Sequence, residues 1–462
     1  MRTPPRLSPI PGRKPQPKFK TDWAVALNSG SGVDPGTFPA KFTFNVGAPP
    51  SCTADFVVFP INANAWNQAN LVALNQLYRG PSGYCGNGNP DTRWAYRVGS
   101  EGVRTSPVLS YPDGDQVAFV ESQGNASVFH VLRWTPGGPI TRPNTPAAGA
   151  LRSVQYANAT NTRSSPFVDY GEDAAYVGAD NGYLYKIKPV FGPGTLVATS
   201  VLVTSGAPLT GAVRDPLTGL VFVSDGQYVK AYDSNLASKG QLLVSCFSTG
   251  IADPPIVDAT NKFLYVISRY DSIYSGAAAV QIPYSTSLGV FRTPVYGNIG
   301  STGGNDLRSG AFDNDYYTAP GSGALYVSGN QGSSAWANPA LYKFTFQSTG
   351  TMNATPVVKN TKIGSATGEC SPLTEFFNVK DRLFLSHSGV HQVQMWELPV
   401  ASADDNLDAF AGYDGGTCGI IVDNISPEAQ ASSIYFSTRG AYTSKCTYGW
   451  ICAVKLTQAG LL

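Results

Sequence analysis

The segment Ser165-Pro166-Phe167-Val168-Asp169, followed by Ala174-Ala175-Tyr176-Val177-Gly178-Ala179-Asp180-Asn181-Gly182-Tyr183-Leu184-Tyr185-Lys186-Ile187, decides the fold. We read it as three short strands, because apolar and polar residues alternate and turn residues separate the runs. The Asn-Gly pair indicates a hairpin, since both residues tolerate the positive φ that a tight β-turn requires. Weaker copies of this unit recur along nearly the whole chain.

The repeat has eight copies, which we align on the second strand. These strands are expected at residues 55–59, 116–120, 175–178, 220–224, 263–266, 324–328, 382–386 and 433–437. Small residues open a preceding first strand in seven copies, at 106–109, 165–169, 211–215, 254–258, 310–313, 371–374 and 419–423, and residues 41–46 take this place in the first copy. The copies lie about 43 to 62 residues apart, a spacing that is typical of four-stranded propeller blades.

The two ends of the chain predict how the ring closes. The last copy has no fourth strand after its third, whereas residues 21–30 resemble the fourth strand of the first copy, residues 92–100. An N-terminal strand that completes the last blade would leave only short edges. We therefore predict an all-β fold, an eight-bladed β-propeller of four-stranded antiparallel blades, as one domain over residues 21–462. Seven blades are the alternative, with the irregular first copy as a decoration.

The best copy resembles the quinoprotein (PQQ-type) β-propeller repeat. The resemblance lies in Ser164-Ser165-Pro166 with Val168-Asp169, then the run from Tyr176 to Tyr185, and a fourth strand that contains Trp, as at Trp94. It spans about residues 21 to 462 and implies an eight-bladed ring. Non-catalytic scaffolds share this repeat, and the adjacent Cys-Cys pair of the enzymes is absent here, so we predict no cofactor.

Composition limits the partners and the compartment. Charged residues are 14% of the 462 residues and the net charge is +1, with basic residues scattered along the folded region, which argues against nucleic acid. No apolar run is long enough for a membrane span. Residues 1–20 carry six Lys or Arg, no acid and many prolines, and are expected to form a disordered basic arm. Few charges, few Met and few His favour an exported protein, extracellular or periplasmic.

Four charged residues are candidates for a site at the axis. Arg104, Arg163, Arg308 and Glu369 each stand two residues before the small residue that opens a first strand. This shared position should place them around one mouth of the central channel, where guanidinium groups could bind a carboxylate or phosphate. Two interpretations stay open: the mouth binds an anionic small molecule or a glycan group, or each Arg pairs structurally with an acid or a neighbouring carbonyl.

Most of the seven cysteines are expected to form disulfide bonds, because no pair has the spacing of a zinc site. Cys446 and Cys452 flank one short loop of the last blade, and Cys52 and Cys85 fall in two loops on the opposite face of the first blade. Cys370 and Cys418 occupy matching positions at the start of neighbouring inner strands. We therefore predict these three pairs as disulfides, with Cys246 left as a buried thiol.

No motif in the sequence predicts catalysis or a metal. His387 and His391 lie four apart, but on a loop, and Asp313-Asn314-Asp315 is more typical of a turn than of a calcium loop. We therefore predict a non-enzymatic binding or scaffolding module for an unknown protein, a glycan or a small anionic ligand. The alternatives are an enzyme that uses the axial pocket, either a divergent quinoprotein dehydrogenase or a polysaccharide hydrolase or lyase, and a protein that self-associates through the arm and apolar loops such as residues 62–66.

Overall fold

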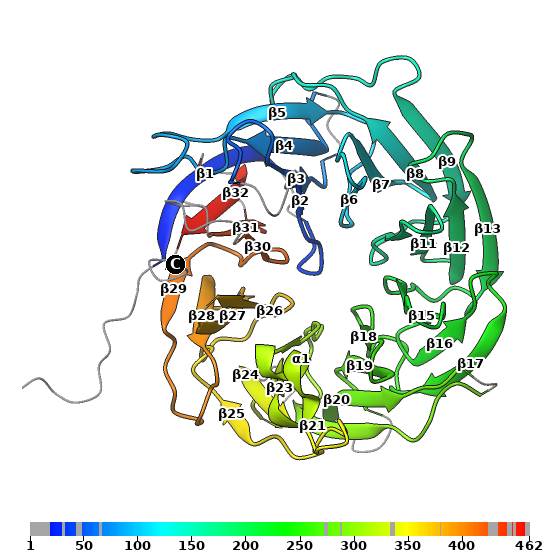
Figure 1. Cartoon of the computed structure of the whole chain (residues 1–462), viewed down its shortest axis with the longest axis vertical. Helices are drawn as coiled ribbons and strands as arrows, with labels where there is room; N and C mark the ends of the chain where they lie inside the picture. The colour runs from blue at the N-terminus through cyan, green and yellow to red at the C-terminus, as the bar shows by residue number, and fades with distance from the viewer. Residues whose placement is uncertain are drawn as a thin grey trace, which may run out of the picture.

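The repeat units fold as eight four-stranded antiparallel sheets arranged radially about one axis in the computed structural model (Figure 1). The protein is an all-β, eight-bladed β-propeller, as predicted, and the first copy is a full blade. The structure describes residues 19–29, 33–42, 49–63, 67–271, 276–286, 289–332, 338–378, 380–423, 433–440, 446 and 450–457. Among these residues, no helix has the length and apolar character that crossing a membrane requires.

The strands of blades 1 to 4 run in chain order from the axis outwards. Blade 1 contains β2 (Ala40–Phe42), β3 (Phe56–Pro60), β4 (Leu71–Asn75) and β5 (Asp91–Tyr96), and blade 2 contains β6 (Val108–Leu109), β7 (Gln116–Gln123), β8 (Ala126–Arg133) and β9 (Leu151–Ala157). Blade 3 contains β10 (Phe167–Asp169), β11 (Ala174–Gly178), β12 (Tyr183–Lys188) and β13 (Val197–Leu202), and blade 4 contains β14 (Val213–Arg214), β15 (Val221–Ser224), β16 (Tyr228–Tyr232) and β17 (Ser238–Leu243).

Blades 5 to 7 follow the same plan, and blade 8 differs only in taking its outermost strand from the N-terminus. Blade 5 contains β18 (Ile256–Asp258), β19 (Phe263–Ser268), β20 (Gly276–Pro283) and β21 (Val295–Ser301), and blade 6 contains β22 (Ala311–Phe312), β23 (Ala324–Asn330), β24 (Pro339–Thr345) and β25 (Val358–Asn360). Blade 7 contains β26 (Thr374–Asn378), β27 (Lys380–His387), β28 (Gln392–Glu397) and β29 (Ala409–Gly412), and blade 8 contains β30 (Ile421–Asp423), β31 (Ser433–Ser437), β32 (Trp450–Thr457) and β1 (Lys20–Ser29). Helix α1 (Asn314–Thr318) and the 3-10 turn η1 (Pro320–Ser322) connect β22 to β23.

The N-terminal strand closes the ring, as predicted. Strand β1 pairs antiparallel with β32, from Lys20 opposite Thr457 to Ser29 opposite Trp450, so both ends of the chain build blade 8 (Figure 1). Phe19 is buried, so Phe19 and Lys20 belong to the ring and not to the predicted arm. Residues 1–18 lie outside the described residues, as do 43–46 of the predicted first inner strand and 64–66 of the predicted apolar loop.

Successive side chains of a middle strand point to opposite faces of the sheet, so each blade packs against both of its neighbours. In β11, Val177 shares a buried cluster with Phe129 of blade 2, whereas Tyr176 shares one with Val223 of blade 4. Each blade therefore buries its apolar residues only by packing on two neighbours. The inner strands have little room: a Cβ added to Gly310 would lie 2.4 Å from the carbonyl oxygen of Tyr326.

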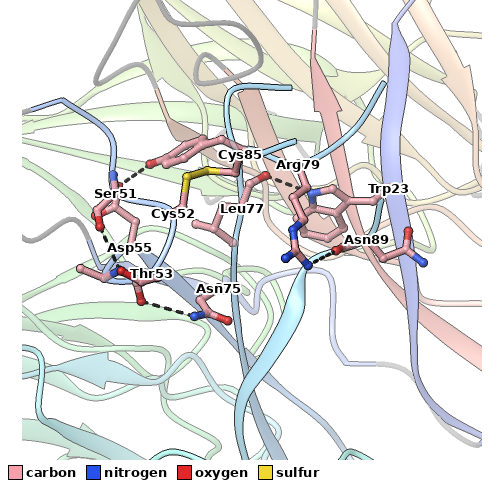
Figure 2. Close-up of a disulfide and its surroundings, with 12 residues drawn as sticks. Trp23, Ser51, Cys52, Thr53, Asp55, Asn75, Leu77, Arg79, Cys85 and Asn89 are labelled. Carbon is pink, nitrogen blue, oxygen red and sulfur yellow. Dashed lines mark hydrogen bonds between the residues drawn. A yellow bond between two sulfur atoms is a disulfide. The ribbon is translucent and has the colours of Figure 1, made fainter. Parts of the chain in front are cut away.

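Two of the three predicted disulfides are present. Cys52–Cys85 joins two loops of blade 1, and Figure 2 shows the bridge beside Trp23 of β1, whose indole N–H donates to the carbonyl of Leu77. Cys446–Cys452 pins the loop between β31 and β32. Both bridges fit an oxidising compartment.

The predicted Cys370–Cys418 bridge is wrong, because both residues are separate buried thiols. Cys370 packs in the apolar layer between blades 6 and 7, whereas Cys418 packs between blades 7 and 8 and accepts a hydrogen bond from the Ser437 amide. The two inner strands are neighbours, but their thiols face different layers. Cys246 was predicted to be a buried thiol, and this is also wrong, because Cys246 is exposed.

Candidate functional site

The four predicted charged residues meet at one end of the axis, which we call the mouth. Arg104, Arg163 and Arg308 line a cavity of about 510 Å³ there. Glu369 lines a neighbouring cavity of about 340 Å³ and accepts hydrogen bonds from Arg308. The structure brings these four residues together, because each stands in the connection that leads into an inner strand.

A segment before β2, residues 33–38, crosses the mouth and divides it. Thr37 Oγ1 donates to the carbonyl of Arg104 at 2.7 Å, and the Phe38 amide donates to Ser106 Oγ at 2.8 Å, both in blade 2. A Cβ on Gly36 would lie 3.0 Å from Nη1 of Arg308, which belongs to blade 6. The loop that precedes β2 thus reaches into the central opening (Figure 1). The larger cavity lies between this segment and blades 2 to 6.

Arg308 is the centre of an ion-pair network. Its Nη1 donates to Asp253 Oδ1 at 2.9 Å, and its Nε and Nη2 donate to Glu369 Oε1 at 2.9 and 2.6 Å. Burial alone would lower the pKa of Arg308, but Asp253 and Glu369 outweigh burial and raise it. The second oxygen of Glu369 accepts from Arg439 Nη1 at 3.1 Å. Arg308 and Glu369 therefore support the structural interpretation, since each holds the other.

Arg163 is held more loosely. Its Nη2 lies 3.5 Å from Asp306 Oδ2, and its side chain is 29% exposed. Asp306 also pairs with Arg269, at 3.3 Å between its Oδ1 and Nη1. Arg163 therefore shares its carboxylate with two other guanidinium groups, those of Arg269 and Arg308, and it lines the larger cavity.

Arg104 differs from the other arginines of the mouth. Arg104 lines the larger cavity and is half-buried, and within the described part of the chain no carboxylate pairs with its guanidinium. Asp34, on the segment that crosses the mouth, also lines this cavity with an exposed side chain. Apolar walls come from Phe38 and Phe167, and hydroxyls come from neighbouring Ser and Thr residues. This arrangement can bind a compact anion against Arg104.

Sequence reasoning missed much of the network around the mouth. Asp253 and Asp306, like the predicted residues, stand in connections that lead into inner strands. Arg269 directly follows β19, and Arg439 lies two residues after the end of β31. Charged residues at the ends of second strands were a usable signal, because these ends lie on the same face as the starts of the inner strands. Residues 33–38 gave no signal, since no other copy of the repeat has a counterpart.

The two histidines singled out as weak metal candidates lie in different surroundings. His387 is fully buried, and burial lowers its pKa to about 4. His391 has a positive φ of 56°, and its Nδ1 accepts from the Gly415 amide. In the described residues, no group of three His, Cys, Asp or Glu is arranged to hold a metal. Asp313 of the other candidate caps α1 by accepting from the Tyr316 amide.

Several solved β-propellers resemble this ring. BamB from Moraxella catarrhalis aligns over 95% of this chain and 100% of its own, at 11% identity and a TM-score of 0.50. Sqt1 from Chaetomium thermophilum aligns over 96% of this chain and 98% of its own, at 10% identity and a TM-score of 0.56. Sqt1 bound to the N-terminus of the ribosomal protein L10 aligns over 95% and 100%, at 11% identity and a TM-score of 0.52.

At these identities the likeness shows a shared β-propeller fold and nothing more. No protein-family model matches the sequence, and no curated protein does. The function therefore has to be argued from the mouth itself.

Proposed function

We propose that the protein is a binding module that seats an anionic group, a carboxylate or a phosphate, against Arg104 in the cavity of the mouth. The observation that carries this proposal is the contrast between Arg104, which has no acidic partner among the described residues, and Arg308, which has two at hydrogen-bond distance. A guanidinium without a carboxylate keeps its fork of donors for a ligand.

Arg163 is the second donor of the proposed site. It lines the same cavity, and its long contact with Asp306 leaves other N–H groups for a ligand. Asp253, Asp306 and Glu369 all accept from guanidinium groups, which favours a binding role over acid–base catalysis at the mouth. The ring supplies a rigid frame for such a site on its loops.

The ligand-bearing partner is proposed to be a protein, and the module to act after export to an extracellular or periplasmic space. Sqt1, which shares the fold, was solved with a protein N-terminus bound, and this supports a propeller that takes up a terminus or segment of a partner. The two disulfides support export, because such bonds persist in oxidising compartments.

A thermal unfolding experiment with inorganic phosphate or acetate tests the proposal. A ligand that binds only the folded state stabilises it by RT ln(1 + [L]/Kd), about 2.7 kcal/mol at a concentration of 100 Kd. At constant ionic strength, we expect one of the two anions to raise the Tm of the wild type more than the other does. The anion with the larger effect shows whether the site prefers a phosphate or a carboxylate. Arg104→Gln should remove the rise.

Arg142→Gln is the matched control, because Arg142 is exposed in the loop between β8 and β9, at the other end of the axis. It makes the same change of charge and should keep the full rise. Equal rises in all three proteins, or no rise with either anion in the wild type, would show that Arg104 does not bind such a group.

A further inference from the structure

The face opposite the mouth, the far face, carries exposed aromatic side chains beside carboxylates. In blade 6, Tyr317 of α1 is 70% exposed, and in blade 7, Phe377 near the end of β26 is 47% exposed. Asp315 is exposed on the same helix, and Glu375 of β26 and Asp381 of β27 are half-buried. We call these five residues the far-face patch.

Blades 6 and 7 hold the patch together. The amide of Asn314, at the start of α1, donates to Asp381 Oδ2 at 2.7 Å. Phe377 pairs with Asp381 across the β26–β27 hairpin, so the aromatic ring and the carboxylate belong to one turn. The patch is therefore a surface of fixed geometry and not a set of separate loop tips.

The negative charge of the patch is not neutralised by the described residues. None of the salt bridges among them involves Asp315 or Asp381. Burial, Asp381 and Asp313 together raise the pKa of Glu375 to about 9, with no cation acting against them, so Glu375 is protonated near pH 7 and the charge of the patch lies on the aspartates. An exposed apolar surface with uncompensated negative charge suits a basic segment that also has apolar residues.

The chain enters the ring on this same face. Lys20 Nζ donates to the carbonyl of Pro81, in the far-face loop between β4 and β5. The ring of Phe19 packs 6.1 Å from that of Phe384, which belongs to blade 7. Residues 1–18 are therefore joined to the far face beside the blade that carries half of the patch.

The composition of residues 1–18 complements the patch. The segment has no acidic residue, and its basic residues are Arg2, Arg6, Arg13, Lys14 and Lys18. It is also rich in proline, and proline-rich segments bind to surfaces lined with aromatic side chains. An extended chain of this length spans up to about 55 Å, which is enough to cross from blade 8 to blade 6.

We propose that residues 1–18 bind the far-face patch of the same molecule. Basic side chains pair with Asp315 and Asp381, and prolines pack on Tyr317 and Phe377. The tether raises the effective concentration of the segment to the millimolar range, so a weak contact suffices. Docking would cover the aromatic surface while the molecule is alone.

Limited trypsin digestion of the full chain tests this docking, because Arg6 and Arg13 are cleavage sites within the segment. We expect cleavage there to be at least about fivefold faster in the double variant Asp315→Asn with Tyr317→Ser than in the wild type at low salt. Both residues are exposed, so the ring should keep its Tm. At 0.5 M salt the difference between variant and wild type should shrink, since charge pairs are screened.

The matched control is Tyr111→Ser with Asp113→Asn. These residues have the same two-residue spacing and are exposed on the far face of blade 2, across the axis from the patch. The control should cleave at the wild-type rate. Equal rates in all three proteins, or equal acceleration by the control, would overturn the proposal. Protection that grows with protein concentration would assign the segment to a second copy of the chain and also overturn it.

Discussion

A fully buried ion pair joins the two strands that close the ring, which makes Lys455→Met a sharp perturbation. Lys455 Nζ in β32 lies 3.2 Å from Asp22 Oδ2 in β1, and both side chains are inaccessible to water. Thr457 also donates to Asp22. The variant keeps the length and apolar stem of the side chain but leaves the carboxylate of Asp22 without its ammonium partner.

The expected loss follows from the cost of an unpaired buried charge. Removing one partner of a buried pair costs about 3–5 kcal/mol. With an unfolding entropy of about 2.1 cal/mol/K per residue over about 440 residues, the Tm should fall by about 3–5 °C if the ring unfolds as a unit. Urea unfolding and calorimetry measure these two quantities.

The loss should depend on pH with a definite sign. Burial raises the pKa of Asp22, and the nearby Lys455 opposes that rise. In the variant the pKa therefore rises further, so the folded state keeps a proton that the unfolded state releases near pH 3.9. Stability is then lost as pH rises above that value, by at most about 1.4 kcal/mol per pH unit. The loss should be much larger at pH 8 than at pH 5.

Lys359→Met is the matched control, because Lys359 in β25 is exposed. It should change stability by less than about 0.5 kcal/mol. A loss under about 1 kcal/mol for Lys455→Met, or an equal loss at pH 5 and pH 8, would refute the assignment of the Asp22–Lys455 pair to ring closure.

Three further predictions follow from buried groups elsewhere in the ring. Glu375 has a raised pKa of about 9, so the wild type loses stability as pH rises from about 4.5 through 9. Glu375→Gln should therefore be more stable than the wild type by about 2 kcal/mol at pH 8 but not at pH 4. An equal gain in stability at both pH values would contradict this. Arg308→Met leaves Asp253 and Glu369 without their guanidinium and should lose about 3 kcal/mol in urea unfolding, whereas an unchanged midpoint would show that the network is solvated. In native alkylation with mass mapping, Cys246 should react, whereas Cys370 and Cys418 should react only after unfolding, because burial blocks access to them and raises the pKa of their thiols to about 12 and about 11.

The fold could be predicted because one physical constraint repeats in every blade. Middle strands must alternate side chains between two apolar layers, and Val177 and Tyr176 already show that alternation in the sequence. The closure by residues 21–30 was visible because β1 fills the fourth-strand position that the last copy lacks. Both inferences rest on strand patterns, which are local.

The mouth could be predicted only in part, since contacts across a ring are not local. Register alone brought Arg104, Arg163 and Arg308 to one end of the axis. It could not show that Arg308 is held by Asp253, nor that residues 33–38 cross the opening, because neither follows from the repeat.

The same limit explains the error at Cys370 and Cys418. Matching positions on neighbouring inner strands suggested that the two thiols lie close together. The layer that each side chain faces depends on the packing of the whole blade, and here one thiol lies on each side of blade 7.

The most direct test of the proposed function is a calorimetric titration of the full chain with inorganic phosphate at constant ionic strength. The wild type and Arg142→Gln should bind with the same dissociation constant, and Arg104→Gln should bind at least about tenfold more weakly, the loss expected for one charge-assisted contact. Equal dissociation constants for Arg104→Gln and Arg142→Gln, or no measurable heat of binding in the wild type, would contradict an anion site at the mouth.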